Sequence, residues 1–292
     1  MGPANAPAAA GFGLCSAVSW GGSDFIGGLG ARRASALLVT ISGHLVSFLA
    51  LLAVCLGFRM VIPGGHALVY AALGGFEGAL ALAAFYRALA MGAMGLTAAL
   101  TGLLTALVPI VFSAIHYGLP APFTAVGLGV GCVAIFLITH QPAAKTGSNS
   151  AVTPPAALLL GALAGTGFGL QLILFRLASS EMTGGDGLLW IMTAARGAGV
   201  TAILLVLLAK PPKGLGRGFW LAGISAGALD TVGNLLYLRA TEFGRLDVAA
   251  VICSLYPAVT ILLAALVLRE RPTRRQIAGM ALALGAVLLL ST

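Results

Sequence analysis

The chain has 292 residues, of which 59% are hydrophobic and only 8% are charged, and its mean hydropathy is +1.04. A soluble domain carries about 25% charged residues, so the composition argues against a water-soluble globular enzyme, a disordered chain and a disulfide scaffold. The formal charge of +8 comes from 16 Lys and Arg against 8 Asp and Glu, which lie singly or in small clusters between apolar stretches. That distribution is typical of a membrane protein and argues against a nucleic-acid partner.

The opening residues and the cysteines give two further expectations. Residues 1–10 contain no Lys or Arg, whereas a cleavable signal begins with a basic segment, so we expect the first apolar stretch to remain as a membrane span. The cysteines lie inside apolar runs without metal-ligand spacing, which predicts neither a metal site nor a disulfide framework; they are Cys15, Cys55, Cys132 and Cys253.

In chain order, ten apolar runs are long enough to be membrane helices, because a bilayer core of about 30 Å needs about 20 apolar residues per helix. They cover residues 8–30, 36–58, 67–90, 96–117, 121–140, 156–178, 187–209, 219–240, 248–268 and 276–291. None alternates polar and apolar residues with a period of two, as the strands of a membrane barrel do. The predicted fold class is therefore an all-α integral membrane protein with ten transmembrane helices.

An internal repeat divides these runs into two halves. The longest polar connection, residues 141–155, lies near the middle of the chain, and an offset of 152 residues aligns Arg87 with Arg239 and Pro120 with Pro272. We therefore predict two five-helix repeats, residues 1–140 and 156–292, joined by the loop 141–155. An odd number of spans per repeat inverts the second one, an arrangement that is typical of secondary transporters with a site at the repeat interface.

Short motifs resemble those of the drug/metabolite transporter superfamily, in its EamA-like branch of ten-helix exporters. The residues concerned are Trp20-Gly21-Gly22-Ser23-Asp24-Phe25, then Tyr256-Pro257, Glu270-Arg271-Pro272 and Ile277-Ala278-Gly279. The first half departs from the pattern, with Thr105 in place of the repeat-equivalent proline and Gly118 in place of the glutamate. Among relatives, exporters of amino acids, including aromatic ones, are the nearest functional analogy that the resemblance implies.

Ionisable residues inside the predicted spans are the first candidates for a binding site. A charge at mid-bilayer costs at least about 2.5–3.5 kcal/mol, so it needs a partner, water or a function. Acids on spans three and eight would face basic groups on spans two and seven around a central cavity. There, Glu77 or Asp230 would take up a proton or bind a substrate amine, and Arg196 would face a carboxylate; permanent structural pairing is the alternative. The residues of this set are Asp24, His44, Glu77, Arg196 and Asp230.

Helix faces add the remaining candidates. Small and polar residues on the eighth span recur at steps of four and three, which places them on one inward face. Aromatic residues could stack on a substrate side chain, or anchor the helix ends as an interfacial belt, the alternative that is stronger for Trp190. The predicted substrate-binding set is completed by Trp20, Ser23, Gln171, Trp190, Asn234 and Tyr237.

Proline and glycine patterns suggest moving and packing elements. Pro109 and Pro257 interrupt spans four and nine and are hinge candidates for alternating access, or plain packing kinks. The pairs Gly127/Gly131 and Gly279/Ala283 predict that helices five and ten pack closely, either between the two halves or in a homodimer.

Two indications of orientation conflict. The loops opposite the termini hold eleven Lys and Arg and the terminal side holds four, which by the positive-inside rule places the termini outside. The superfamily resemblance implies cytoplasmic termini. A reporter that fluoresces only in the cytoplasm, fused after Thr292, decides between them.

The sequence therefore predicts a secondary active transporter that exports amino acids or related small metabolites by alternating access, with proton coupling as an option. It would lie in the cell membrane, the inner membrane in a Gram-negative bacterium, and its partners would be the lipid bilayer and a small-molecule substrate. No catalytic residue, metal or cofactor is predicted. The alternatives are an exporter of drugs or other organic solutes and, from other classes, a channel or an intramembrane enzyme.

Overall fold

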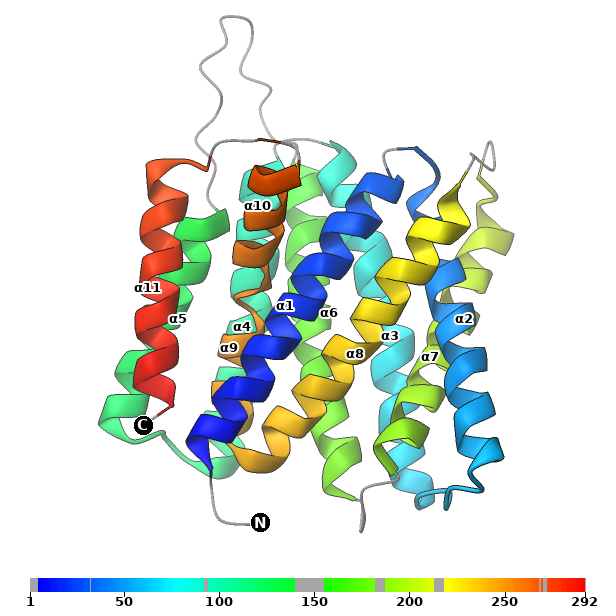
Figure 1. The fold of residues 1–292 in the computed structure, drawn as a ribbon, viewed down its shortest axis with the longest axis horizontal. Helices are drawn as coiled ribbons and strands as arrows, with labels where there is room; N and C mark the ends of the chain where they lie inside the picture. Colours follow the sequence, from blue (N-terminus) through cyan, green and yellow to red (C-terminus); the bar gives the residue numbers. More distant parts are fainter. Residues whose placement is uncertain are drawn as a thin grey trace, which may run out of the picture.

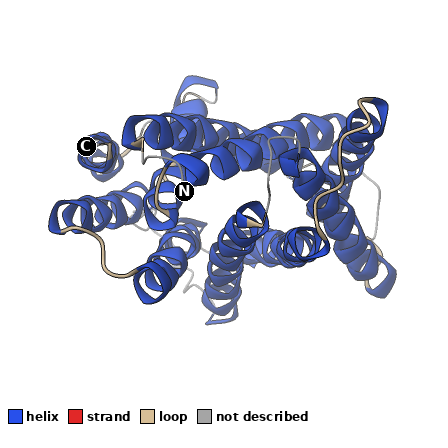
Figure 2. Cartoon of the chain, turned by 90° about the horizontal axis from the view of Figure 1, so that it is seen from below, coloured by secondary structure: helices blue, strands red, loops and turns tan. Residues whose placement is uncertain are grey.

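The structure is a computed structural model, and it describes residues 5–31, 33–91, 94–139, 155–181, 187–212, 218–267, 269 and 272–291. Every described element is a helix (Figure 2). The first half forms α1 (Ala6–Ala31), α2 (Ala36–Gly57), α3 (Gly65–Met91), α4 (Met94–Tyr117) and α5 (Pro122–Thr139). The second half forms α6 (Pro155–Ser180), α7 (Gly187–Ala209), α8 (Phe219–Phe243), α9 (Leu246–Cys253), α10 (Tyr256–Val267) and α11 (Arg274–Leu290).

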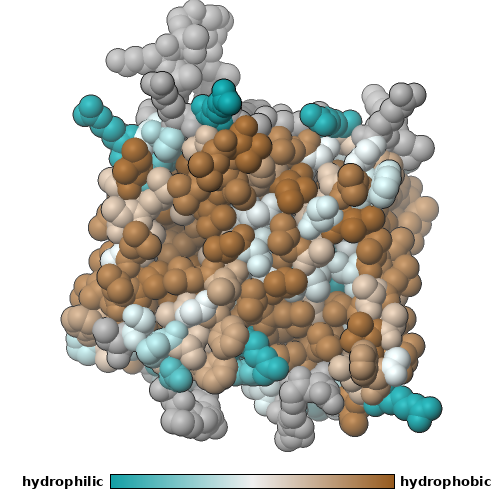
Figure 3. All heavy atoms as spheres, viewed as in Figure 1, coloured by the Kyte–Doolittle hydropathy of each residue, from teal (hydrophilic) through white to brown (hydrophobic). Residues whose placement is uncertain are grey.

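The outer surface of the bundle is apolar, which confirms the predicted all-helical membrane architecture. Within the described residues, seven helices are long and apolar enough to cross a membrane, the pair α9 and α10 counting as one span. Figure 3 shows a broad hydrophobic band with hydrophilic residues concentrated at its two ends. Large side chains such as Ile115, Leu159 and Leu288 are more than half exposed, as helices that face lipid require.

Glycines allow the helix backbones to approach one another. A Cβ on Gly227 of α8 would meet the backbone of Gly43 on α2, and one on Gly75 of α3 would meet the backbone of Ala195 on α7. Small residues at such contacts are typical of membrane helices, where close van der Waals packing replaces hydrophobic burial. The helices of the two halves are therefore interleaved: α8 packs on α1 and α2, and α3 packs on α6 and α7.

Helices α5 and α11 pack against each other at one edge of the bundle (Figure 1). Gly127 of α5 lies against Leu290 of α11, and Gly279 of α11 lies against Ile138 of α5. The small residues predicted to mediate close packing are therefore used between the two halves of one chain. A homodimer through these helices stays a prediction.

The ninth predicted span is divided. Helix α9 ends at Cys253 and α10 begins at Tyr256, so the break lies at residues 254–255, just before Pro257. Pro257 falls in the first turn of α10, where a missing backbone N–H costs nothing. Pro109, by contrast, lies inside the continuous helix α4.

Candidate functional site

A cavity lies at the centre of the bundle, between helices of both halves. It encloses about 660 Å³ of non-protein space, a figure that includes its open mouth. Seven predicted substrate residues line it: Trp20, Asp24, His44, Gln171, Arg196, Asp230 and Asn234. The rest of the lining consists of Gly78, Leu82, Phe85, Thr105, Phe168, Leu172 and Tyr256.

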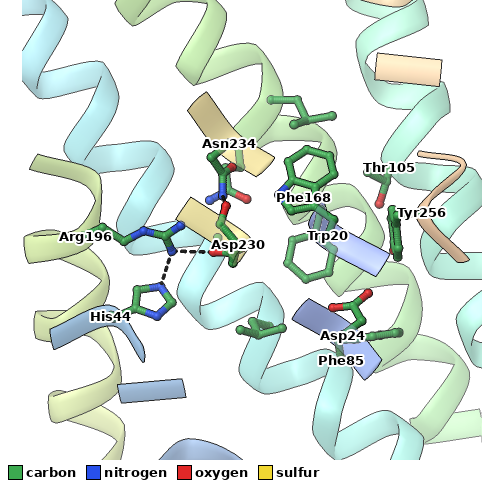
Figure 4. Close-up of a pocket in the computed structure, with 14 residues that line it drawn as sticks. Trp20, Asp24, His44, Phe85, Thr105, Phe168, Arg196, Asp230, Asn234 and Tyr256 are labelled. Carbon is green, nitrogen blue, oxygen red and sulfur yellow. Dashed lines mark hydrogen bonds and ion pairs between the residues drawn. The ribbon is translucent and has the colours of Figure 1, made fainter. Parts of the chain in front are cut away.

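An ion pair between α7 and α8 forms one wall of this cavity. Arg196 Nη1 lies 2.6 Å from Asp230 Oδ2, and the arginine side chain is 5% exposed against 32% for the aspartate (Figure 4). Asn234, one turn further along α8, donates from Nδ2 to the backbone oxygen of Asp230 at 2.7 Å. The pair therefore presents its carboxylate to the cavity and keeps its guanidinium behind it.

His44 on α2 supports the same guanidinium. Its Nδ1 lies 3.0 Å from the backbone oxygen of Thr40, and its Nε2 lies 3.4 Å from Arg196 Nη1. A neutral imidazole with its proton on Nδ1 satisfies both contacts, because Nδ1 then donates and Nε2 accepts. The interaction joins α2 to α7 through two residues that occupy equivalent positions in the predicted repeats.

The remaining donors of Arg196 have no hydrogen-bond partner among the residues that the structure describes. Both Nε and Nη2 are buried without a hydrogen bond, although unsatisfied buried donors are rare and costly. Two adjacent N–H groups of a guanidinium are the edge that binds a carboxylate in a bidentate manner. Arg196, which lines the cavity, therefore has on one edge two donors that could bind a carboxylate and that have no partner among the described residues.

A second acid, Asp24 on α1, faces the cavity and forms no ion pair with any described residue. The cavity lining thus holds one cationic side chain, Arg196, and two acids, Asp24 and Asp230, with a formal charge of −1. Such a site attracts a solute that carries a positive group.

Aromatic side chains cover the opposite wall (Figure 4). Trp20 meets Tyr256 edge-on with ring centroids 6.3 Å apart, and Phe85 meets Phe168 in the same way at 6.1 Å. Edge-to-face pairs at this distance are favourable and hold the rings in place. This wall is suited to an apolar or aromatic group of a solute.

Four predicted substrate residues lie elsewhere. Tyr237 is fully buried behind Trp20, and its hydroxyl donates to the Leu172 oxygen at 2.7 Å. The Ser23 hydroxyl donates to the Ala226 oxygen at 2.9 Å and joins α1 to α8. Trp190 donates to the Met60 oxygen at 3.2 Å, where α7 begins, and Glu77 lies between α3 and α6 beside Gly167.

Sequence reasoning missed part of the aromatic wall and the face of α3 below it. Gly78, Leu82 and Phe85 follow steps of four and three along α3, a spacing that could have identified this face. Phe168 is close to Gln171 in the sequence, and Tyr256 is part of the family-like motif. No pattern in the sequence distinguishes these aromatic residues from those that face lipid.

Comparison with known proteins gives a family match for the second half of the chain and a shared fold for nearly all of it. Residues 155–292 match the model of the EamA-like transporter family. A solved crystal structure of another protein aligns with 96% of this chain and 97% of its own, with a TM-score of 0.73 and 18% identity, so the two share their fold. No curated protein matches this chain. The second half of the chain therefore matches an EamA-like transporter domain, and the whole chain shares its fold with the solved structure.

Proposed function

We propose that the protein is a secondary active transporter that exports amino acids or similar small metabolites across the cell membrane. The observation that supports this most is Arg196, which lines the cavity and whose Nε and Nη2 have no partner among the described residues. The same cavity is lined by Asp24, which forms no ion pair with a described residue, and by an aromatic wall. A carboxylate, an amine and an apolar side chain are the three parts of an amino acid, and each has a matching group here.

The three parts can be assigned to residues. The substrate carboxylate binds Nε and Nη2 of Arg196, while Nη1 retains its contacts with Asp230 and His44. The ammonium group binds Asp24, and the side chain packs on Trp20 and Phe168. Since Nε and Nη2 are buried in this state, α7 and α8 must shift slightly when the carboxylate docks.

Ten spans in two inverted repeats, residues 1–140 and 156–292 with the loop 141–155 between them, are part of the proposal. The packing pairs support it: α1 with α8 has its counterpart in α6 with α3, and α2 with α8 in α7 with α3. The start of α1 and the end of α11 also lie at the same end of the bundle (Figure 1). Inverted repeats of this kind rock against each other around a central site, with the break before Pro257 as the hinge candidate; Pro109 stays the second one.

The test is transport by purified protein in proteoliposomes, with a panel of radiolabelled amino acids and their amides. Arg196→Gln should raise the half-saturation concentration of the amino acids by about 10- to 100-fold, the value of a charge-assisted hydrogen bond or two. The amides, which lack the carboxylate, should be affected little. Arg196→Lys keeps the positive charge that pairs with Asp230 and so separates the effect of the guanidinium from that of the charge. Arg239→Gln, which changes an exposed arginine outside the cavity, is the control for loss of an arginine elsewhere.

Several outcomes contradict this function. Equal losses for acids and amides would assign Arg196 to packing. Transport without saturation and without counterflow would indicate a channel, and chemical change of the solute would indicate an enzyme.

A second candidate is an exporter of organic cations or drugs. The formal charge of −1 on the cavity lining favours it, because a cation with an apolar body needs only Asp24 and the aromatic wall. In the same assay a lipophilic cation should then be transported by Arg196→Gln as well as by the wild type, while Asp24→Asn abolishes transport.

A further inference from the structure

Glu77 on α3 is a partly buried acid that the proposed substrate site does not use. Its Oε2 is buried and accepts no hydrogen bond from any residue in the described part of the chain. A Cβ added to Gly167 of α6 would collide with Oε1 of Glu77 and with Ala81. The carboxyl group therefore occupies space in the α3–α6 interface that exists only because residue 167 is glycine.

No charged group of the described residues compensates this carboxyl. Helices α2, α4, α6 and α7 pack on α3, and none of their ionisable side chains forms an ion pair or hydrogen bond with Glu77. The two basic residues buried on α2 and α7 are already engaged, because His44 contacts Thr40 and Arg196, and Arg196 is paired with Asp230. The other ionisable residues on these helices and on α3 itself are Cys55, His66, Tyr70, Tyr86, Arg87, His116, Tyr117 and Arg176.

The interface connects Glu77 to the cavity. Gly78, the next residue, lines the cavity and lies against Gln171 of α6, which also lines it. Gln171 is one helical turn from Gly167, so both residues lie on the face of α6 that meets α3. A change in the spacing of α3 and α6 at Glu77 therefore reaches the cavity wall one turn away.

We propose that Glu77 is a proton-binding site, separate from the substrate site, that couples transport to a pH gradient. The proposal rests on the proposed transport function and adds its coupling ion. One proton from one compartment binds a carboxylate oxygen, and the neutral carboxyl stays packed against Gly167. The proton leaves toward the other compartment, and the resulting carboxylate needs water, since an unpaired charge in a dry interface is costly. Proton release is thus tied to separation of α3 from α6.

The first experiment detects the proton without any substrate. Infrared difference spectra of the full-length protein in lipid, between alkaline and acidic pH, report the carbonyl band of protonated carboxyl groups. We expect one band of the wild type to be absent in Glu77→Gln and present in Asp24→Asn and in the surface control Glu242→Gln. A band that persists in Glu77→Gln and disappears in Asp24→Asn would overturn the proposal.

The second experiment separates coupling from substrate binding. Proteoliposomes are assayed with radiolabelled L-leucine and L-phenylalanine, by net transport under a pH gradient and by exchange without one. Glu77→Gln should lose the acceleration by the gradient and retain the exchange rate to within about twofold. Retained acceleration, or a parallel loss of exchange, would overturn the coupling role. If the wild type transports neither amino acid, the amino-acid function fails while the infrared result still decides whether Glu77 binds a proton.

Discussion

Tyr237 stabilises the protein through a hydrogen bond that crosses from α8 to α6. Its side chain is fully buried, and its hydroxyl donates to the backbone oxygen of Leu172 at 2.7 Å. The ring lies behind Trp20, with centroids 6.1 Å apart, so it supports the aromatic wall from the side away from the cavity. In this position the residue holds in place a tryptophan that lines the cavity.

We therefore expect Tyr237→Phe to lower stability and to leave transport affinity unchanged. The loss should be about 0.5–1.5 kcal/mol, the net value of one hydrogen bond, and it is measured as a lower unfolding midpoint in detergent. Tyr70→Phe is the control, since the Tyr70 hydroxyl makes no hydrogen bond among the described residues. A raised half-saturation concentration with an unchanged midpoint would instead make Tyr237 a substrate residue, as its sequence pattern suggested.

At the scale of helices, the contact between α2 and α8 determines where His44 and Asp230 stand. Gly43 and Gly227 meet backbone to backbone, and a Cβ on Gly227 would lie closer to Gly43 than real atoms approach. The Ser47 hydroxyl, one turn along α2, donates to the Gly227 oxygen at 3.2 Å. Because the obstacle is backbone, no side-chain rotation can relieve an added methyl group.

Gly227→Ala should accordingly destabilise the protein by about 1–3 kcal/mol, as overpacking in a core does. The matched control is Gly28→Ala on α1, where an added Cβ meets nothing within 4 Å and the helix gains about 0.5–1 kcal/mol from the substitution. Thermal unfolding of the two variants in the same detergent compares them. Equal midpoints would show that α2 and α8 can separate without cost.

At the scale of the whole molecule, Arg245 links the two halves by hydrogen bonds at the end of the bundle where α4 ends. Its Nη2 donates to Asp247 Oδ2 at 2.9 Å, to the Gly118 oxygen at 3.0 Å and to Ser113 Oγ at 3.3 Å. Asp247 is fully buried in the first turn of α9, and the arginine side chain is 34% exposed. The start of α9 is thereby tied to the end of α4.

Arg245→Met should cost about 3 kcal/mol, the lower end for breaking a buried pair, because it leaves the Asp247 carboxylate alone. The double variant Arg245→Met/Asp247→Leu should recover part of this loss, since no unpaired charge then stays buried. Arg239→Met breaks only the exposed pair with Glu242 and should cost less than about 1 kcal/mol. Denaturation midpoints that do not differ between the two single variants would contradict the linking role.

The sequence predicted the helices well because lipid imposes a requirement on each segment separately. Each described helix falls within a few residues of a predicted apolar run, and only the break at residues 254–255 divides a run that was expected to be single. The family-like motif drew attention to Pro257, but helix α9 ends before it and Pro257 lies in the first turn of α10. The first turn of a helix tolerates proline and the interior does not.

The cavity was predicted in part. Arg196, Asp230 and His44 were conspicuous because charge is scarce, and the structure places them in contact. Their repeat register also suggested that Glu77 would face a basic group, yet His44 turns to Arg196 and Glu77 is left beside Gly167. The aromatic wall was mostly missed, because nothing in the sequence around Phe85 and Tyr256 distinguishes them from aromatic residues that face lipid.

The low proportion of charged residues, with the length of the apolar runs and their lack of alternation, determined that the protein is a helical membrane protein. The same scarcity marked the few ionisable residues that lie inside the spans. Whether a segment can face lipid depends on how apolar its residues are and on the spacing at which polar residues recur, so it can be read directly from the sequence. Only the tertiary structure decided which partner each charge has, because pairing depends on how each helix is rotated and on where glycines let two backbones approach. That geometry pairs Arg196 with the Asp230 carboxylate. It leaves Glu77 without a charged partner among the described residues.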